Sequence, residues 1–137
     1  MNEDDVKLVQ ASPALPVRDV AGSVAFYRDR LGFAVWHQDV GFAIVGRDDV
    51  EIHLWEASDE GWRVRTPSSP VVSGAESFIA GTASCRVQVE GVDELHAELL
   101  PQGVLHPSGQ LGDKPWGTRE FAVLDSDGNL VTFFERV

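Results

Sequence analysis

The sequence predicts an α+β fold made of two tandem modules, each with the element order β-α-β-β-β. The main observation behind this is an internal repeat, which is clearest in a pair of hairpins. Near the end of the chain, apolar runs at residues 121–124 and 130–134 flank an Asp-Gly-Asn turn, a pattern typical of a β-hairpin. An earlier hairpin of similar pattern begins at Phe42, 79 positions before Phe121. A match in register over two strands and a turn indicates that one unit is present twice.

The repeat extends back to the beginning of each module. Val17 and Val89 open matching segments with an offset of 72 positions, whereas the hairpins are offset by 79. The second module therefore carries about eight extra residues, which lie between Val104 and Trp116. Their content of proline, glycine and serine predicts a loop.

The first module is expected to begin with a strand at residues 8–18. Pro13 and Pro16 lack the N–H group that a central strand donates, so this strand should lie at an edge or between subunits. Asp19 is a favourable N-cap for the helix that follows. Gly32 should end that helix, because glycine readily adopts the left-handed conformation found just after a helix. Three further strands are expected at residues 33–39, 41–46 and 50–57.

The second module follows a long connection, residues 58–81, that is rich in glycine, proline and serine. It should contain a strand at 82–90, a helix at 92–100, a weak strand around Val104 and Leu105, and the final hairpin. The expected organisation is a single domain over residues 1–137, with module 1 at about 8–57 and module 2 at about 82–136.

The composition limits the classes of function. With 137 residues, of which 43% are hydrophobic and 24% charged, the chain suits a folded domain. The net charge of −11 argues against nucleic acid or an anionic membrane as a partner, and it would attract a cationic ligand or simply keep the protein soluble. No stretch is apolar for long enough to span a membrane, and the acidic N-terminus does not resemble a signal peptide. The single cysteine, Cys85, excludes an internal disulfide, so we expect a cytoplasmic protein.

Alternation along the strands predicts which side chains share a face of each sheet. In module 1, Glu51, His53 and Trp55 should lie on the face opposite to Ile52 and Leu54. In module 2, the corresponding open face should carry Ser84, Arg86, Gln88 and Phe134, the last at the position that matches Trp55. Large aromatic side chains on such a face favour a covered groove, and the alternative is an ordinary solvated face.

Two longer motifs carry a resemblance to a known family. The first is the Val-Arg-Asp-Val, Phe-Tyr and Leu-Gly-Phe series in residues 17–33. The second is the Lys-Pro-Trp-Gly-Thr-Arg-Glu-Phe run followed by Asp-Ser-Asp-Gly-Asn in residues 114–129. With the paired modules, these motifs resemble the vicinal oxygen chelate superfamily and, within it, the bleomycin-resistance proteins. The resemblance covers about residues 8–136, although the loop at 60–83 departs from the usual pattern of those proteins.

This resemblance implies a shape and an assembly. Each module would curve its antiparallel-type sheet into a half-barrel with the helix outside. Members of the family form homodimers, often with the first strand exchanged between subunits. The resistance proteins bind the drug in two grooves at the dimer interface and do not modify it.

The resemblance also locates the metal-ligand positions of metal-dependent members, such as glyoxalase I and the extradiol dioxygenases. They fall on Ser12 and His53 in module 1 and on Ser84 and Thr132 in module 2. Only His53 is a good transition-metal ligand, because hydroxyl groups bind Zn, Fe or Ni poorly. We therefore expect no bound metal and no cofactor. The alternative is a site that His53 forms together with Glu51 or Glu135.

Catalysis by protein side chains has little support in the sequence. Cys85 is expected on the core side of its strand, where a thiol is usually inert. Glu51 and His53 share a face, but positions i and i+2 of a strand are about 7 Å apart, a loose geometry for proton transfer.

The expected function is therefore the non-catalytic binding and sequestration of a cationic glycopeptide antibiotic of the bleomycin type, which gives resistance. Trp116 should stack on a planar part of the ligand at the rim of the groove. Asp39 and Glu51 should meet its cationic end. The other side chains expected to line the groove are Trp36, His37, Phe42, His53, Trp55, Arg86 and Gln88. The alternative is a glyoxalase-like or dioxygenase-like enzyme, or a binder of another small ligand, from the same superfamily.

Overall fold

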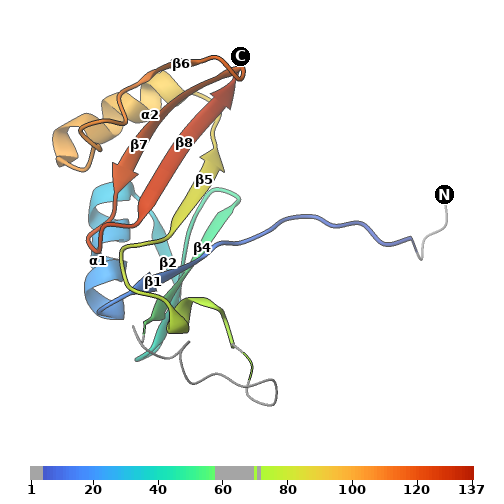
Figure 1. Ribbon diagram of the computed structural model, residues 1–137, viewed down its shortest axis with the longest axis vertical. Helices are drawn as coiled ribbons and strands as arrows, with labels where there is room; N and C mark the ends of the chain where they lie inside the picture. The colour runs from blue at the N-terminus through green and yellow to red at the C-terminus, as the bar shows by residue number, and fades with distance from the viewer. Residues whose placement is uncertain (1–4, 58–69, 71) are drawn as a thin grey trace.

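The computed structural model describes residues 5–57, 70 and 72–137, which form two four-stranded sheets (Figure 1). In the first sheet the strand order is β1-β4-β3-β2, and in the second it is β5-β8-β7-β6. The first module consists of β1 (Ala14–Val17), α1 (Val20–Leu31), β2 (Ala34–Gln38), β3 (Phe42–Arg47) and β4 (Val50–Glu56). The second consists of β5 (Ser84–Gln88), α2 (Val92–Leu99), β6 (Gly112–Lys114), β7 (Thr118–Leu124) and β8 (Leu130–Arg136), with the short 3₁₀ helices η2 (Ala75–Ser77) before it and η3 (Leu100–Gln102) after α2.

Both sheets are mixed, and the predicted α+β fold with two β-α-β-β-β modules is confirmed. The first strand of each module runs parallel to the last, β1 beside β4 and β5 beside β8, while the other neighbours are antiparallel. The parallel pairs arise because each helix carries the chain from the first strand to the opposite edge of the sheet. The three antiparallel strands that follow then bring the last strand back beside the first, running in the same direction. The expectation of antiparallel-type sheets therefore holds for the hairpins and not for the first strands.

The internal repeat determines most of the register. Ala14 lies opposite His53 in module 1, and Arg86 lies opposite Thr132 in module 2, which reproduces the offsets of 72 and 79. The third strand is different, because Phe42 pairs with Trp55 whereas Glu120 pairs with Phe134. The predicted equivalence of Phe42 and Phe121 is therefore wrong by one residue. The second hairpin has one more residue in its turn, which moves Glu120 into the place of Phe42.

Two other predictions were wrong in extent. The first strand is only Ala14–Val17, and the segment before it, residues 5–12, is exposed and projects away from the sheets as an arm (Figure 1). The segment between Val104 and Trp116 is not only a loop. It contains β6, which pairs with β7 and forms the edge of the second sheet. The weak strand expected at Val104 and Leu105 is reduced to a single bridge between Leu105 and Val123.

The helices begin and end for identifiable reasons. The Asp19 side chain accepts a hydrogen bond from the Gly22 N–H at the start of α1, and Gly32 after its end adopts the left-handed conformation with φ of 75°. At α2 the N-cap is Gly91, which has no capping side chain. Glu135 of β8 substitutes for a cap, because its carboxylate accepts hydrogen bonds from the N–H groups of Gly91 and Val92 at 3.1 Å each.

Each helix packs on one face of its own sheet, and the apolar side chains between them form one shared core. In module 1 the fully buried Ile52 and Leu54 face α1, as their alternation predicts. The other face of each sheet carries the polar and aromatic residues. No helix in the described part of the chain is long and apolar enough to cross a membrane.

A buried polar cluster joins the two modules. The Tyr27 hydroxyl of α1 donates to Asp125 Oδ2 at 2.9 Å, and burial raises the pKa of both groups. Asn129 is completely buried, and its Nδ2 donates to the Pro16 carbonyl of β1 at 2.9 Å and to Asp125 Oδ2 at 3.1 Å. Its Oδ1 accepts from the Ala83 N–H at 3.1 Å. The turn between β7 and β8 therefore attaches module 2 to the first strand and helix of module 1.

Replacement of Asn129 tests the importance of this cluster. Asn129→Ala should lower the free energy of unfolding by about 2–4 kcal/mol, because it removes the Asn129 amide donors from buried oxygens of Asp125 and Pro16. Urea denaturation followed by circular dichroism measures the change. Ser126→Ala, at an exposed position of the same turn, is the control and should change stability by less than about 0.5 kcal/mol. Equal stability of the two variants would contradict the role assigned to Asn129.

Candidate functional site

Five ring side chains gather on the open face of module 1, and we call this group the module-1 face: Trp36, His37, Phe42, His53 and Trp55. Phe42 lies at its centre. Its ring centroid is 4.5 Å from that of Trp55, 5.4 Å from that of His53 and 5.6 Å from that of His37. All five residues were predicted from the sequence to line one groove, and the structure brings them onto one face of the sheet.

Two local features produce this gathering. A register irregularity in β2 between Val35 and His37 allows Trp36 and His37 both to face the open side. Gly46 of β3 then leaves room for the Trp36 indole, which occupies the space where any larger side chain would carry its Cβ atom. Half of the Trp36 surface remains exposed, at 50%. The ring is therefore supported by backbone on one side and accessible on the other.

Carboxylates flank the rings and are ionised at neutral pH. His37 Nε2 lies 3.1 Å from Asp39 Oδ2, and His53 Nε2 lies 2.6 Å from Glu51 Oε2. The hydrogen bonds from the two imidazoles are the main cause that lowers the pKa of Asp39 and of Glu51. Ser12 Oγ also donates to Glu51, at 3.3 Å. The expectation of a loose geometry between Glu51 and His53 is wrong, because their side chains lean toward each other along the strand and come within 2.6 Å.

The open face of module 2 is organised by a different set of residues, which we call the module-2 face: Arg86, Trp116, Thr118, Glu120 and Phe134. Arg86 Nη2 donates to Glu120 Oε2 at 2.8 Å, and the guanidinium carbon lies 4.6 Å from the Phe134 ring centroid. Thr118 Oγ1 donates to the same Glu120 oxygen at 2.7 Å. Hydrogen bonds from Arg86 and then from Thr118 and Trp116 hold the pKa of Glu120 at about 2, so this carboxylate is ionised.

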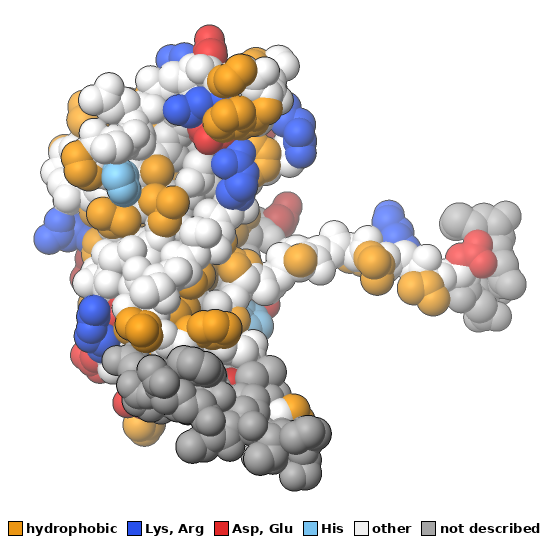
Figure 2. Space-filling model, in the orientation of Figure 1, with side chains coloured by type: hydrophobic (Ala, Val, Ile, Leu, Met, Phe, Trp, Pro, Cys, Tyr) orange, Lys and Arg blue, Asp and Glu red, His pale blue; other side chains and the backbone are white. Residues whose placement is uncertain are grey.

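Trp116 lies in the tight turn between β6 and β7 and is 63% exposed. Gly117, which follows it, has a φ of 91° and donates its N–H to the Lys114 carbonyl at 3.1 Å, so the turn needs glycine there. This turn is at the far end of the second sheet, where the C-terminus also lies and where Lys and Arg side chains surround hydrophobic ones (Figures 1 and 2). Within one chain, Trp116 is therefore remote from the module-1 face.

The two faces meet at a small cavity of about 370 Å³. Glu51 of module 1 and Arg86 and Gln88 of module 2 line it, together with Gln10 and Pro13 at the base of the arm. The structure thus brings together these three predicted residues from separate modules. It leaves Trp116, in the turn at the far end of the second sheet, away from this cavity.

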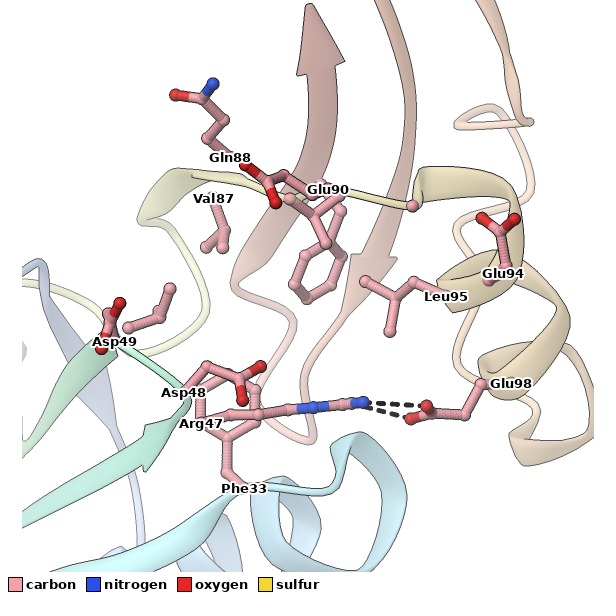
Figure 3. Close-up of a pocket in the computed structure, with 14 residues that line it drawn as sticks. Phe33, Arg47, Asp48, Asp49, Val87, Gln88, Glu90, Glu94, Leu95 and Glu98 are labelled. Carbon is pink, nitrogen blue, oxygen red and sulfur yellow. Dashed lines mark hydrogen bonds and ion pairs between the residues drawn. The ribbon is translucent and has the colours of Figure 1, made fainter.

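A second cleft, of about 740 Å³, separates the modules on the side of the helices (Figure 3). Arg47 crosses its base and makes an ion pair with Glu98 at 2.7 Å. The other charged side chains around it are all acidic, namely Asp48, Asp49, Glu90 and Glu94. Its two phenylalanines, Phe33 and Phe133, are nearly fully buried in the core. This cleft would attract cations, but it offers no exposed ring on which a planar ligand could stack.

Comparison with known proteins decides the family. The profile of the Glyoxalase/Bleomycin resistance protein/Dioxygenase superfamily matches residues 9–133. The chain belongs to this superfamily. It is 55% identical over 130 residues to bleomycin resistance proteins of Geobacillus stearothermophilus and Staphylococcus aureus, and the match covers 95% of this chain and 98% of each relative. The resemblance found in the sequence is thereby confirmed.

Solved structures of superfamily members share the fold. A bleomycin-binding protein from Streptomyces verticillus, in complex with copper(II)-bleomycin, has a TM-score of 0.73 at 29% identity, covering 94% of this chain and 97% of that one. A lactoylglutathione lyase from Agrobacterium tumefaciens has a TM-score of 0.71 at 16% identity, covering 96% of each chain. The scaffold is therefore common to binding proteins and to enzymes of the superfamily, so the function has to be argued from the side chains.

The four positions at which the resemblance predicts metal ligands, Ser12, His53, Ser84 and Thr132, can now be located. His53 and Ser12 both contact Glu51, Ser84 is exposed, and Thr132 is half-buried. Among residues 5–57, 70 and 72–137, no three His, Cys, Asp or Glu side chains form a group suited to a metal ion. The thiol of Cys85 is half-buried, and burial raises its pKa to about 11, so it is protonated at neutral pH.

The sequence analysis missed Glu120 and Thr118. The assumed offset of 79 placed Phe121, rather than Glu120, in line with Phe42. The alternation within β7 would have found both, because Thr118, Glu120 and Ala122 alternate with Arg119, Phe121 and Val123. Phe121 and Val123 face the core, so the alternate set faces the open side of the sheet.

Proposed function

We propose that this protein binds a cationic glycopeptide antibiotic of the bleomycin type and sequesters it without chemical change, thereby giving resistance. The observation that carries the proposal is the module-1 face, where accessible rings lie beside two ionised carboxylates, Asp39 and Glu51. Rings favour the planar part of such a ligand and carboxylates favour its cationic part. The 55% identity to bleomycin resistance proteins supports the same function.

Each contact has a modest expected strength. Stacking of a planar heteroaromatic group on an indole contributes on the order of 1–3 kcal/mol, by analogy with stacked nucleobases. The carboxylates act mainly through long-range attraction and orientation, because they are exposed and screened by salt. The net charge of −11 adds to this attraction over the whole molecule. High affinity therefore requires several rings to contact the ligand at once.

One observation favours a second candidate, an enzyme of the same superfamily acting on a small ligand. The 2.6 Å contact between His53 and Glu51 is a geometry in which a carboxylate orients an imidazole for proton transfer. Most reactions would also need a nucleophile or an electrophilic group close to this pair. The Cys85 thiol lies on β5 of the other module, is half-buried, and has a raised pKa. Recovery of the bound drug with unchanged mass separates sequestration from catalysis.

We also propose that the binding unit is a homodimer in which the arm at residues 5–12 is exchanged between subunits. Val6, Leu8 and Val9 of the arm are almost fully exposed in the single chain, and hydrophobic side chains run along its length (Figure 2). Apolar residues on a projecting segment favour burial against another surface. In a two-fold assembly, the module-1 face of one copy and the module-2 face of the other would enclose a groove that neither copy forms alone.

Calorimetric titration with metal-free and with copper-loaded bleomycin tests the binding function. The wild-type protein should bind one drug molecule per chain. Trp116→Ala should weaken binding by about tenfold to hundredfold, since it removes one stacking surface, and should leave the melting temperature almost unchanged because the indole is exposed. Leu100→Ala, which removes an exposed apolar side chain on η3, is the control and should bind normally. Normal binding with a much lower melting temperature for Trp116→Ala would show that this residue is structural.

Sedimentation velocity tests the assembly. The wild-type protein should be a dimer at micromolar concentration. The triple variant Val6→Ser, Leu8→Ser, Val9→Ser should have a dimer dissociation constant at least about tenfold larger than that of the wild type, because it lacks the apolar contacts of the arm. Lys7→Ser changes the same segment without removing an apolar side chain and should remain dimeric. A stable wild-type monomer would contradict the proposal.

A further inference from the structure

Glu120 is unusual because it is a buried carboxylate on an open face. It is 6% exposed, although its strand carries it on the side away from the helix and the core. Both of its oxygens face Arg86, with Nη2 to Oε2 at 2.8 Å and Nη1 to Oε1 at 3.4 Å, and Thr118 adds a hydrogen bond at 2.7 Å. A carboxylate held by three donors is fixed in position, so it can in turn fix the groups that cover it.

The covering groups are those that a ligand would meet. Arg86 is about half exposed, with a side-chain exposure of 48%, and a side chain of this length would sample many rotamers without a partner. Glu120 instead holds its guanidinium over the Phe134 ring, at 4.6 Å from the centroid. One buried carboxylate therefore holds a planar guanidinium over an aromatic ring.

Charge adds a second consequence. Lys114 and Arg136 flank Thr118 in the register of β6, β7 and β8, so this end of the second sheet is already cationic. Arg136 also lies over Phe134, at 5.6 Å. Glu120 offsets the charge of Arg86. Without it, a cationic ligand would meet an additional uncompensated guanidinium on the module-2 face.

We propose that Glu120 is a positioning residue for ligand binding, which holds Arg86 over Phe134 and keeps this face acceptable to a cationic ligand. The inference deepens the proposed function and rests on it for the identity of the ligand. It assigns the planar, weakly charged part of the ligand to the module-2 face and its cationic part to the acidic module-1 face.

The test separates binding from stability with a matched pair of variants. Glu120→Gln keeps the size of the side chain and removes its charge. Glu135→Gln makes the same change on the same sheet, but at a carboxylate that caps α2 on the other side. In calorimetric titrations with metal-free bleomycin, Glu120→Gln should bind about tenfold more weakly, whereas Glu135→Gln should bind within about twofold of wild type even where its melting temperature falls. Equal effects of the two variants on binding would overturn the proposal.

A double-mutant cycle with Arg86→Met shows whether Glu120 affects binding through Arg86. If Glu120→Gln folds poorly, Arg86→Met alone still tests the Arg86–Glu120 ion pair, because Arg86 is the more exposed partner. If Glu120 acts through Arg86, the double variant should bind no more weakly than Glu120→Gln alone, and added salt should recover part of the loss in Glu120→Gln by screening the free guanidinium. Losses that simply add, with no dependence on salt, would contradict the role assigned to Arg86.

A measurement without ligand distinguishes failure of this inference from failure of the proposed function. In ¹H–¹⁵N spectra of the free protein, the guanidinium Nε signal of Arg86, assigned with Arg86→Met, should shift in Glu120→Gln and remain in place in Glu135→Gln. An unchanged signal in Glu120→Gln overturns the positioning role whether or not the wild-type protein binds bleomycin. If the signal shifts in Glu120→Gln but the wild-type protein binds no bleomycin, the proposed function is rejected and the positioning of Arg86 is retained.

Discussion

The attachment of the two modules through the β7–β8 turn is the constraint on which the rest of the structure depends. Asp125 and Asn129 are buried polar residues, and their hydrogen-bond partners in module 1 are Tyr27 of α1 and the Pro16 carbonyl of β1. A buried polar group without its partner is costly, so the two sheets have one preferred relative position. The Asp-x-Asp-Gly-Asn motif is therefore more than a turn signal, since it joins one repeat to the other.

This docking buries the helix side of both sheets in one core and leaves both open faces for ligands, although the two faces have diverged in chemistry. On the module-1 face, Phe42 and Trp55 lie beside ionised Glu51. On the module-2 face, Phe134 is covered by Arg86, and Glu120 stands where the repeat would place Phe42. A duplicated scaffold has thus acquired one acidic aromatic wall and one wall of guanidinium, phenyl and indole groups. Such a pair suits a ligand with a cationic end and a planar end.

Sequence patterns predicted the features that depend on local chemistry. Asp19 and Gly32 marked the ends of α1 correctly, because caps are set by the residue and its neighbours alone. Strand alternation also placed Glu51, His53 and Trp55 on the face opposite to Ile52 and Leu54. The errors arose where pairing between strands decides the outcome. The one-residue shift that brings Glu120 onto the open face, the short β6, and the contact between Glu51 and His53 depend on register and rotamers that no local pattern contains.

Mapping of the bleomycin contact by ¹H–¹⁵N correlation spectra tests the central claim, that the open faces of the sheets bind the drug. On titration with metal-free bleomycin, we expect the indole signals of Trp36, Trp55 and Trp116 and the amide signals of Phe42 and His53 to shift together and saturate at one drug per chain. The amides of Gly91 and Glu94, which line the acidic cleft between the modules, should change little. Shifts confined to that cleft, or no saturable shift of the three indoles, would contradict the account.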